Sequence, residues 1–244
     1  MKTEVSASTS YSAPVNTRRP SSMRALLRPK YLLFTFIALM YAYVLWHNES
    51  FLIRPNDPEW PHIHPFRWWL LPHGMIAGTA LLLGPMQFSD RLRKRFAKFH
   101  RVAGRFYVAG VFLGASLGVY IQHFEERLGE TRSFTLAAAA DAAVWILATA
   151  VAMAFILKGN VAQHRQWMTR SFACAIIFLE VRAISGVFNL GTQFDEVIVW
   201  CCVAAAYPLA DLALYGSELF RRRAARAPVS KPTPRSVREI AEPV

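Results

Sequence analysis

The sequence predicts an all-α fold: a polytopic membrane protein that forms a bundle of six transmembrane helices, with both termini in the cytoplasm. Six apolar segments support this prediction, because a helix needs ~20 residues to cross a hydrocarbon layer of about 30 Å. The spacing of Lys and Arg supports it too, because these residues concentrate in alternate connections. The six segments are residues 31–53, 67–88, 102–123, 134–157, 167–190 and 195–216.

The basic residues set the orientation of the bundle. Six of them precede residue 31, six lie in the loop 89–101 and seven follow residue 216, whereas the connection 191–194 holds none. Cytoplasmic loops carry the Lys and Arg excess in membrane proteins. We therefore expect the two tails and the second and fourth loops on the cytoplasmic side.

Composition divides the chain into three parts. Hydrophobic residues make up 54% of it and the net charge is +12. Residues 1–28 and 221–244 are rich in Ser, Thr, Pro and Arg, so we expect disordered basic tails around a transmembrane domain at 29–220. No groove-reading motif accompanies the charge. We expect it to meet the lipid bilayer and its anionic headgroups, and we expect no binding to nucleic acid.

Each of the first three segments has its own signal. The segment 31–53 starts about thirty residues into the chain and lacks a small-residue cleavage site, which indicates an anchor rather than a cleaved signal peptide. The segment 67–88 has small residues at helical spacing, a pattern that lets another helix approach closely. The segment 102–123 follows a strongly basic loop. The face of segment 67–88 that carries these small residues comprises His73, Ala77, Ala80, Gly84 and Gln87.

The last three segments carry the ionisable residues that are least expected inside a membrane. Asp141 lies in the fourth segment, Glu180 and Arg182 in the fifth, and Asp211 in the sixth. The three cysteines also fall in these segments. Their number is odd and no CxxC motif occurs, so we expect small apolar fillers rather than a disulfide or a metal site. The cysteines are Cys174, Cys201 and Cys202.

Depth along the predicted spans sorts the polar residues into two clusters. Such residues are costly in a membrane and mark either a function or a buried pair. The outer cluster comprises His73, His123, Asp141, Glu180 and Arg182. The inner cluster comprises His100, Arg105, His164 and Arg170.

Two interpretations of these clusters stay open: the polar residues either mark a functional site or serve only the structure. His164 and Arg182 are 18 residues apart, which is five whole turns and places them on one helix face. We expect Asp141 to be the ion-pair partner of Arg182. The alternative is a structural role, in which the buried groups only lock helix packing, and His100 and His164 only contact lipid headgroups.

Three local motifs resemble a known family. The first runs from Leu71-Pro72-His73-Gly74 to Leu83-Gly84-Pro85-Met86-Gln87-Phe88, the second is His100-Arg101-Val102-Ala103-Gly104-Arg105-Phe106-Tyr107, and the third is His164-Arg165-Gln166-Trp167-Met168-Thr169-Arg170-Ser171-Phe172, followed by Arg182. Together they resemble the bacterial predicted-membrane-protein family catalogued as domain of unknown function 2306, over about residues 35–216. The resemblance implies a fold and a location in the bacterial inner membrane, and it leaves catalytic residues unknown.

A looser similarity concerns cofactor binding. The chain is similar to six-helix di-haem b-type membrane cytochromes, whose histidines pair between helices two and four and between helices three and five. This similarity implies that His100 and His164 ligate a haem b iron, with His73 as half of a second site. Arg105 and Arg170 are then the expected partners of the haem propionates. The fourth segment offers Asp141 and no histidine for the second site, so a second haem requires His123 as the substitute ligand.

Three classes of function therefore compete. The first is a haem b electron-transfer protein that serves a redox partner or a quinone. The second is a proton-coupled small-molecule transporter that uses the intramembrane carboxylates. The third is a non-catalytic membrane subunit or scaffold. A metal site at His62, His64 and His73 is a minor further hypothesis, and the sequence does not determine the oligomeric state.

Overall fold

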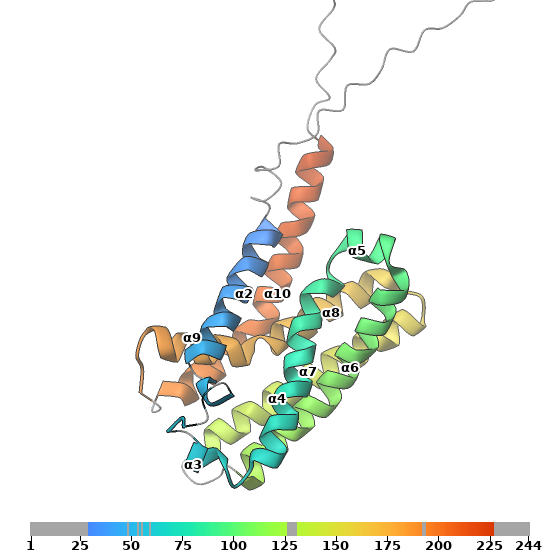
Figure 1. The fold of residues 1–244 in the computed structure, drawn as a ribbon. Helices are drawn as coiled ribbons and strands as arrows, with labels where there is room; N and C mark the ends of the chain where they lie inside the picture. The colour runs from blue at the N-terminus through green and yellow to red at the C-terminus, as the bar shows by residue number, and fades with distance from the viewer. Residues whose placement is uncertain are drawn as a thin grey trace, which may run out of the picture. The chain divides into compact units, whose positions relative to one another are not determined.

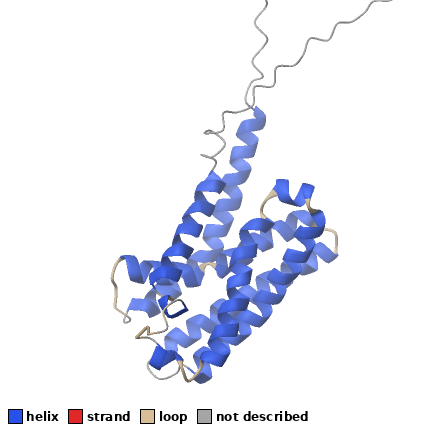
Figure 2. Cartoon of the chain, viewed as in Figure 1, coloured by secondary structure: helices blue, strands red, loops and turns tan. Residues whose placement is uncertain are grey.

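The computed structural model describes residues 29–47, 49–52, 54, 56–58, 60–125, 131–191 and 194–226. The predicted tail 1–28 lies outside the described residues, and so does the part of the C-terminal tail that follows Arg226. The chain divides into two units, Met1–Leu39 and Met40–Val244. Within the part that is described, every regular element is helical (Figures 1 and 2).

Eight helices among the described residues have six or more residues. They are α2 (Pro29–His47), α4 (Arg67–Gln87), α5 (Asp90–Arg95), α6 (Ala97–Tyr120), α7 (Arg132–Leu157), α8 (Val161–Ala175), α9 (Ile177–Val187) and α10 (Asp195–Arg226). Three short elements join them: η1 (Ser50–Leu52), α3 (Trp60–Ile63) and the π-helix η2 (Ile121–Glu125). Each predicted segment thus falls on helical structure, the fifth on two helices, and the last helix runs six residues past the predicted boundary at residue 220.

Four helices among the described residues are long and apolar enough to cross a membrane. They are Arg67–Gln87, Ala97–Phe124, Arg132–Leu157 and Asp195–Leu219. A shorter apolar helix covers Tyr31–His47. The predicted fifth span is instead divided into α8 and α9 at Ile176, where the backbone has φ −88° and ψ −8°. No proline or glycine lies at this break, so no local residue signal predicts it.

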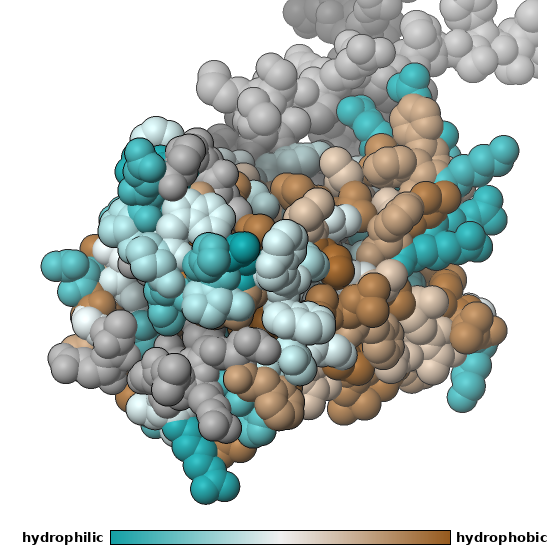
Figure 3. Space-filling model, turned by 60° about the horizontal axis from the view of Figure 1, so that its bottom comes forward, coloured by the Kyte–Doolittle hydropathy of each residue, from teal (hydrophilic) through white to brown (hydrophobic). Residues whose placement is uncertain are grey.

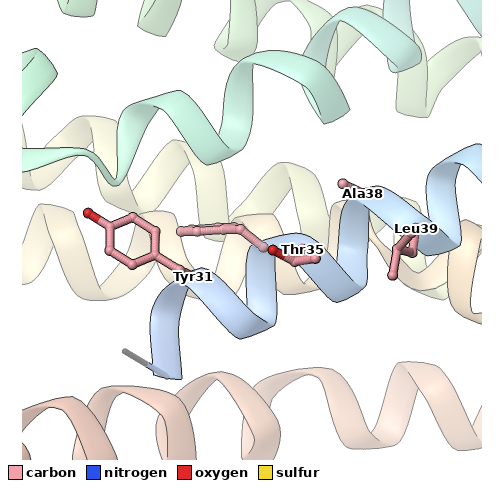
Figure 4. Close-up of a pocket in the computed structure, with 5 residues that line it drawn as sticks. Tyr31, Thr35, Ala38 and Leu39 are labelled. Carbon is pink, nitrogen blue, oxygen red and sulfur yellow. The ribbon is translucent and has the colours of Figure 1, made fainter. Parts of the chain in front are cut away.

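The first unit contributes the N-terminal half of α2. An open recess runs along this half and is lined by Tyr31, Phe34, Thr35, Ala38 and Leu39 (Figure 4). All five residues belong to one helix, and the recess is a groove on the helix surface rather than an enclosed site.

In the second unit, four helices form an antiparallel bundle. Helix α4 packs along α6, α6 packs on α7, α7 packs along α8, and α8 returns to α4. Helix α10 covers the side formed by α7, α8 and α9. The turn between α7 and α8 is tight: Gly159 has φ +75°, and Asn160 caps α8 by accepting a hydrogen bond from Gln163 N at 3.1 Å.

Large apolar side chains cover much of the outer surface. Figure 3 shows hydrophobic residues gathered over a broad area beside a hydrophilic one. Met75 is 75% exposed and Leu157 is 84% exposed. Exposure of apolar side chains on this scale indicates contact with lipid, because a soluble surface rarely carries large contiguous apolar patches.

Small residues form the contact between α4 and α6, as the sequence predicted for the α4 side. A Cβ atom placed on Gly110 would lie 3.2 Å from both Ala80 Cβ and Ile76 O, and one on Gly114 would lie 3.4 Å from Ala77 Cα. The glycines recur every fourth residue, so they share one face of α6. Backbones that approach this closely gain van der Waals contact, which drives helix association in membranes.

We predict that Gly110→Leu destabilises the bundle, because the new side chain meets α4 backbone. Overpacking of this kind costs about 1–3 kcal/mol or more. Gly216→Leu is the matched control, since nothing lies within 4 Å of the Cβ position there. Thermal unfolding of the two variants in the same detergent measures the difference. Equal midpoints would show that the α4–α6 contact is not as close as described.

Candidate functional site

Two histidines meet near the start of α6 and α8. His100 lies within range of electrostatic interaction with His164 and with Arg93. His164 Nδ1 lies 2.9 Å from the backbone oxygen of Ala152 on α7. Because that oxygen can only accept, Nδ1 donates to it, and Nε2 is the ring nitrogen that stays available to another partner. The structure thus places the two predicted histidines within electrostatic range of each other, at the same end of the bundle.

A ring of hydrogen bonds lies two turns further along the bundle. Tyr107 Oη is 2.8 Å from Ser171 Oγ, and Ser171 Oγ is 2.7 Å from Thr149 Oγ1. Thr149 Oγ1 donates to Trp145 O at 2.8 Å, and Trp145 Nε1 donates to Tyr107 Oη at 3.5 Å. The Tyr, Thr and Ser residues are each 0% exposed. The ring joins α6, α7 and α8.

The spacing of this ring explains how the histidines meet. Tyr107 follows His100 by seven residues, and Ser171 follows His164 by seven. Seven residues are close to two helical turns, or about 10 Å along the axis, so each pair shares a helix face. The Tyr107–Ser171 contact therefore brings the two histidines to the same level. The seven-residue spacing from a histidine is visible in the sequence for Tyr107 and Ser171, whereas Thr149 has no such signal because α7 carries no histidine.

An acidic pair lies on the other side of the ring. Asp141 of α7 interacts electrostatically with Glu180 of α9, and Cys174 of α8 lies within range of Asp141. The Cys202 thiol on α10 forms a hydrogen bond with the Glu180 carboxylate. Oδ1 of Asp141 is buried and has no hydrogen-bond partner. Four successive helices, α7 to α10, thus each carry one of these polar side chains.

Only part of the predicted outer cluster comes together here. His73 Nδ1 lies 2.9 Å from Gly114 O on α6, and its ring packs against Gly118. His123 lies in the π-helix η2, with its ring 4.7 Å from that of Phe124. Neither histidine makes a described contact with the acidic pair.

The predicted ion pair between Arg182 and Asp141 is absent from the described residues. The Arg182 guanidinium lies 5.3 Å from the centre of the Phe178 ring, one turn back on the same helix. Arg182 is exposed there, whereas Asp141 faces α8 and α9. The prediction was wrong because residues two apart on a helix cannot both face one partner, and Glu180 takes the inward position.

The arginines predicted beside the inner histidines also lie elsewhere. Arg170 Nε and Nη2 contact Oδ1 of Asp211 on α10 at 2.9 and 2.8 Å, and its guanidinium stacks on Trp167. Arg105 is exposed. The basic side chain near His100 is instead Arg93 of α5, which is held by Asp90 at 2.7 Å.

One unpartnered donor lies near the histidines. Nε2 of Gln87, at the end of α4, is buried and has no hydrogen-bond partner. Its Oε1 lies 3.5 Å from the Cβ position of Gly104, one turn after His100. No group of three or more His, Cys, Asp or Glu side chains in the described part of the chain has the geometry of a metal site. The three cysteines are free thiols.

These helices and their buried polar groups define a multi-pass helical membrane protein. Residues 70–214 match the family described as "Predicted membrane protein (DUF2306)". The match covers more than half of the chain, and the chain belongs to this family. It extends from α4 into α10 and leaves out α2. No curated protein and no solved structure matches the chain.

We predict that Arg170 and Asp211 stabilise each other, whereas Arg182 and Asp141 do not. In a double-mutant cycle, Arg170→Ala and Asp211→Asn should show a coupling of about 0.5–3 kcal/mol, since each removes the same contact. Arg182→Ala and Asp141→Asn should be additive within about 0.5 kcal/mol. Thermal unfolding in detergent measures both cycles. Coupling in the second cycle and additivity in the first would restore the ion pair expected from the sequence.

Proposed function

We propose that the chain crosses the bacterial inner membrane six times, with both termini in the cytoplasm. Helices α8 and α9 act as one span, because a single residue separates them and Glu180 N still donates to Ile176 O at 2.9 Å. Helix α2 supplies a further apolar segment. The basic residues of α5 then face the cytoplasm, as the positive-inside rule requires.

We propose further that His100 and His164 hold a haem b in an electron-transfer site at the cytoplasmic end of the bundle. The observation that carries this proposal is the His164 ring. Its Nδ1 is bound to the Ala152 carbonyl, which leaves Nε2 for iron and fixes the ring orientation. A metal-ligating histidine almost always makes such a bond with its other nitrogen.

The surrounding residues fit one such group. The second imidazole comes from His100, and Arg93 supplies a positive charge for a propionate in place of Arg105 and Arg170. The buried Nε2 of Gln87 has no hydrogen-bond partner and can donate to a bound group. A second haem does not fit, because His73 is bound to α6 and the facing helix α7 offers Asp141 and no histidine.

Haem bound at this place would supply one-electron chemistry with a redox partner or a quinone. The chain's own residues position the haem ligands and insulate the haem. The Ala152 carbonyl orients His164, and the ring of hydrogen bonds around Tyr107 holds α6 and α8 in register. The basic residues of α5 give the cytoplasmic end of the bundle a positive charge, to which an anionic partner can bind.

Absorption spectroscopy of the full chain, expressed with ample haem and purified in detergent, tests the proposal. We expect a Soret band that disappears in His100→Ala and in His164→Ala, because both imidazoles ligate the same iron. His73→Ala is the matched control. It also removes an intramembrane histidine bound to a backbone carbonyl, and it should leave the band in place.

Two results would contradict the haem proposal. A featureless spectrum of the wild-type chain would leave the scaffold or the transporter as the function. A band lost in His73→Ala but kept in His100→Ala would place the haem at another pair. Gel filtration of each variant separates loss of haem from loss of fold.

A further inference from the structure

The first turns of α6 carry a basic face that consists of Lys98, Arg101 and Arg105. These residues follow one another at intervals of three and four, so they lie on one side of the helix. All three are exposed, and among the residues that the structure describes none of them forms an ion pair. Helix α6 contains no Asp or Glu, and the acidic residue of α5, Asp90, is paired with Arg93 at 2.7 Å. The described part of the chain therefore does not balance these three charges.

An apolar strip lies directly beside the basic face. It consists of Phe99, Val102 and Phe106, each of which follows one of the three basic residues by one position, a rotation of about 100° on a helix. All three side chains are exposed, and Phe106 is the most exposed of them at 60%. Further along α6 the same side continues with exposed Ala109 and Leu113. One side of the helix thus presents positive charge first and apolar surface beside and beyond it.

The length of α6 places the basic face at the edge of a membrane. The apolar span Ala97–Phe124 has 28 residues, or about 42 Å of helix, which exceeds a hydrocarbon layer of about 30 Å by about 12 Å. Arg105 follows Ala97 by eight residues, which is also about 12 Å. An arginine at this depth extends its guanidinium to the headgroup level while its methylene groups contact acyl chains.

We propose that this side of α6 binds an anionic phospholipid of the surrounding membrane. The lipid phosphate lies against the basic face, and the acyl chains lie along the apolar strip. A phospholipid matches both surfaces, whereas inorganic phosphate or an acidic protein matches only the basic face. The site is on the outside of the bundle. It depends neither on haem binding nor on which side of the membrane the start of α6 faces.

Native mass spectrometry of the full chain in detergent tests this site. The protein is mixed with equal amounts of phosphatidylglycerol, which is anionic, and phosphatidylcholine, which has no net charge, and the retained lipids are counted. We expect the wild-type protein to prefer phosphatidylglycerol. Each Lys or Arg near an anionic lipid surface contributes about fivefold in binding. The triple variant Lys98→Gln, Arg101→Gln, Arg105→Gln should therefore lower the preference by at least about tenfold.

The matched control removes three exposed basic residues from α5 instead, by Arg91→Gln, Lys94→Gln and Arg95→Gln. It makes the same change in charge on the helix that precedes α6, and it leaves the basic face and the apolar strip intact. It should keep most of the preference. An equal loss in the two triple variants would overturn the proposal, because it would show a general attraction to positive charge rather than a site on α6.

Inorganic phosphate and glycerol phosphate, each added in excess, distinguish a lipid from a soluble anion. Neither should displace phosphatidylglycerol, because neither has acyl chains that contact the apolar strip. Displacement by either one would show that the basic face binds the phosphate group alone. A wild-type protein without preference for phosphatidylglycerol would also contradict the proposal, and it would leave the basic face to an acidic protein.

The single variant Arg105→Gln covers the case in which the triple variant fails to fold. It removes the charge that lies deepest in the span and should lower the preference by about fivefold. Thermal unfolding in the presence of phosphatidylcholine alone checks that this variant keeps its fold. An unchanged preference in the folded variant would show that the lipid does not bind at Arg105, and the proposed site would be wrong.

Discussion

A closed ring of hydrogen bonds through Tyr107, Ser171, Thr149 and Trp145 joins α6, α7 and α8 in the interior of the second unit. Its direction is fixed. The Trp145 carbonyl can only accept, so Thr149 donates to it, Ser171 donates to Thr149, and Tyr107 donates to Ser171. Trp145 Nε1 completes the ring at Tyr107. Every hydroxyl proton then has one acceptor, as burial in an apolar interior demands.

Because the ring joins three helices at one level, it fixes the relative levels of the residues on either side of it along those helices. His100 and His164 are each seven residues before a ring member, so they meet on one side. Asp141 and Cys174 lie on the other side. From His164 to Glu180 the polar groups extend over 16 residues, or about 24 Å of helix. The ring, which includes none of these residues, therefore sets the levels of the inner histidines and of Asp141.

Sequence patterns predicted the helices because apolar length and basic loops are local properties. They also predicted the small-residue face of α4, which meets the glycines of α6. The break at Ile176 was not predictable, because no glycine or proline marks it. The partners of Arg170 and Arg182 were not predictable either, because depth alone does not say which helix face turns inward. Asp211 was noted as intramembrane, yet its meeting with Arg170 depends on how α10 packs on α8.

The polar groups that join these helices are hydroxyl side chains. Composition and charge counts do not single them out. A Ser or Thr in a span usually bonds its own helix, as Ser116 does with Phe112 O at 2.8 Å. Ser171 differs because both of its bonds leave α8. Only the packed structure distinguishes these two uses of the same side chain.

Thermal unfolding of Ser171→Ala in detergent, beside Ser116→Ala, tests whether the ring holds the three helices together. Removing the middle of the ring leaves the Tyr107 hydroxyl without its acceptor, which should cost about 1–3 kcal/mol. Ser116→Ala should stay within about 0.5 kcal/mol of wild type. The loss should also be less than additive with Tyr107→Phe, since both remove the same bond. Equal stability of the two serine variants, with additivity, would contradict a ring that holds α6, α7 and α8 together.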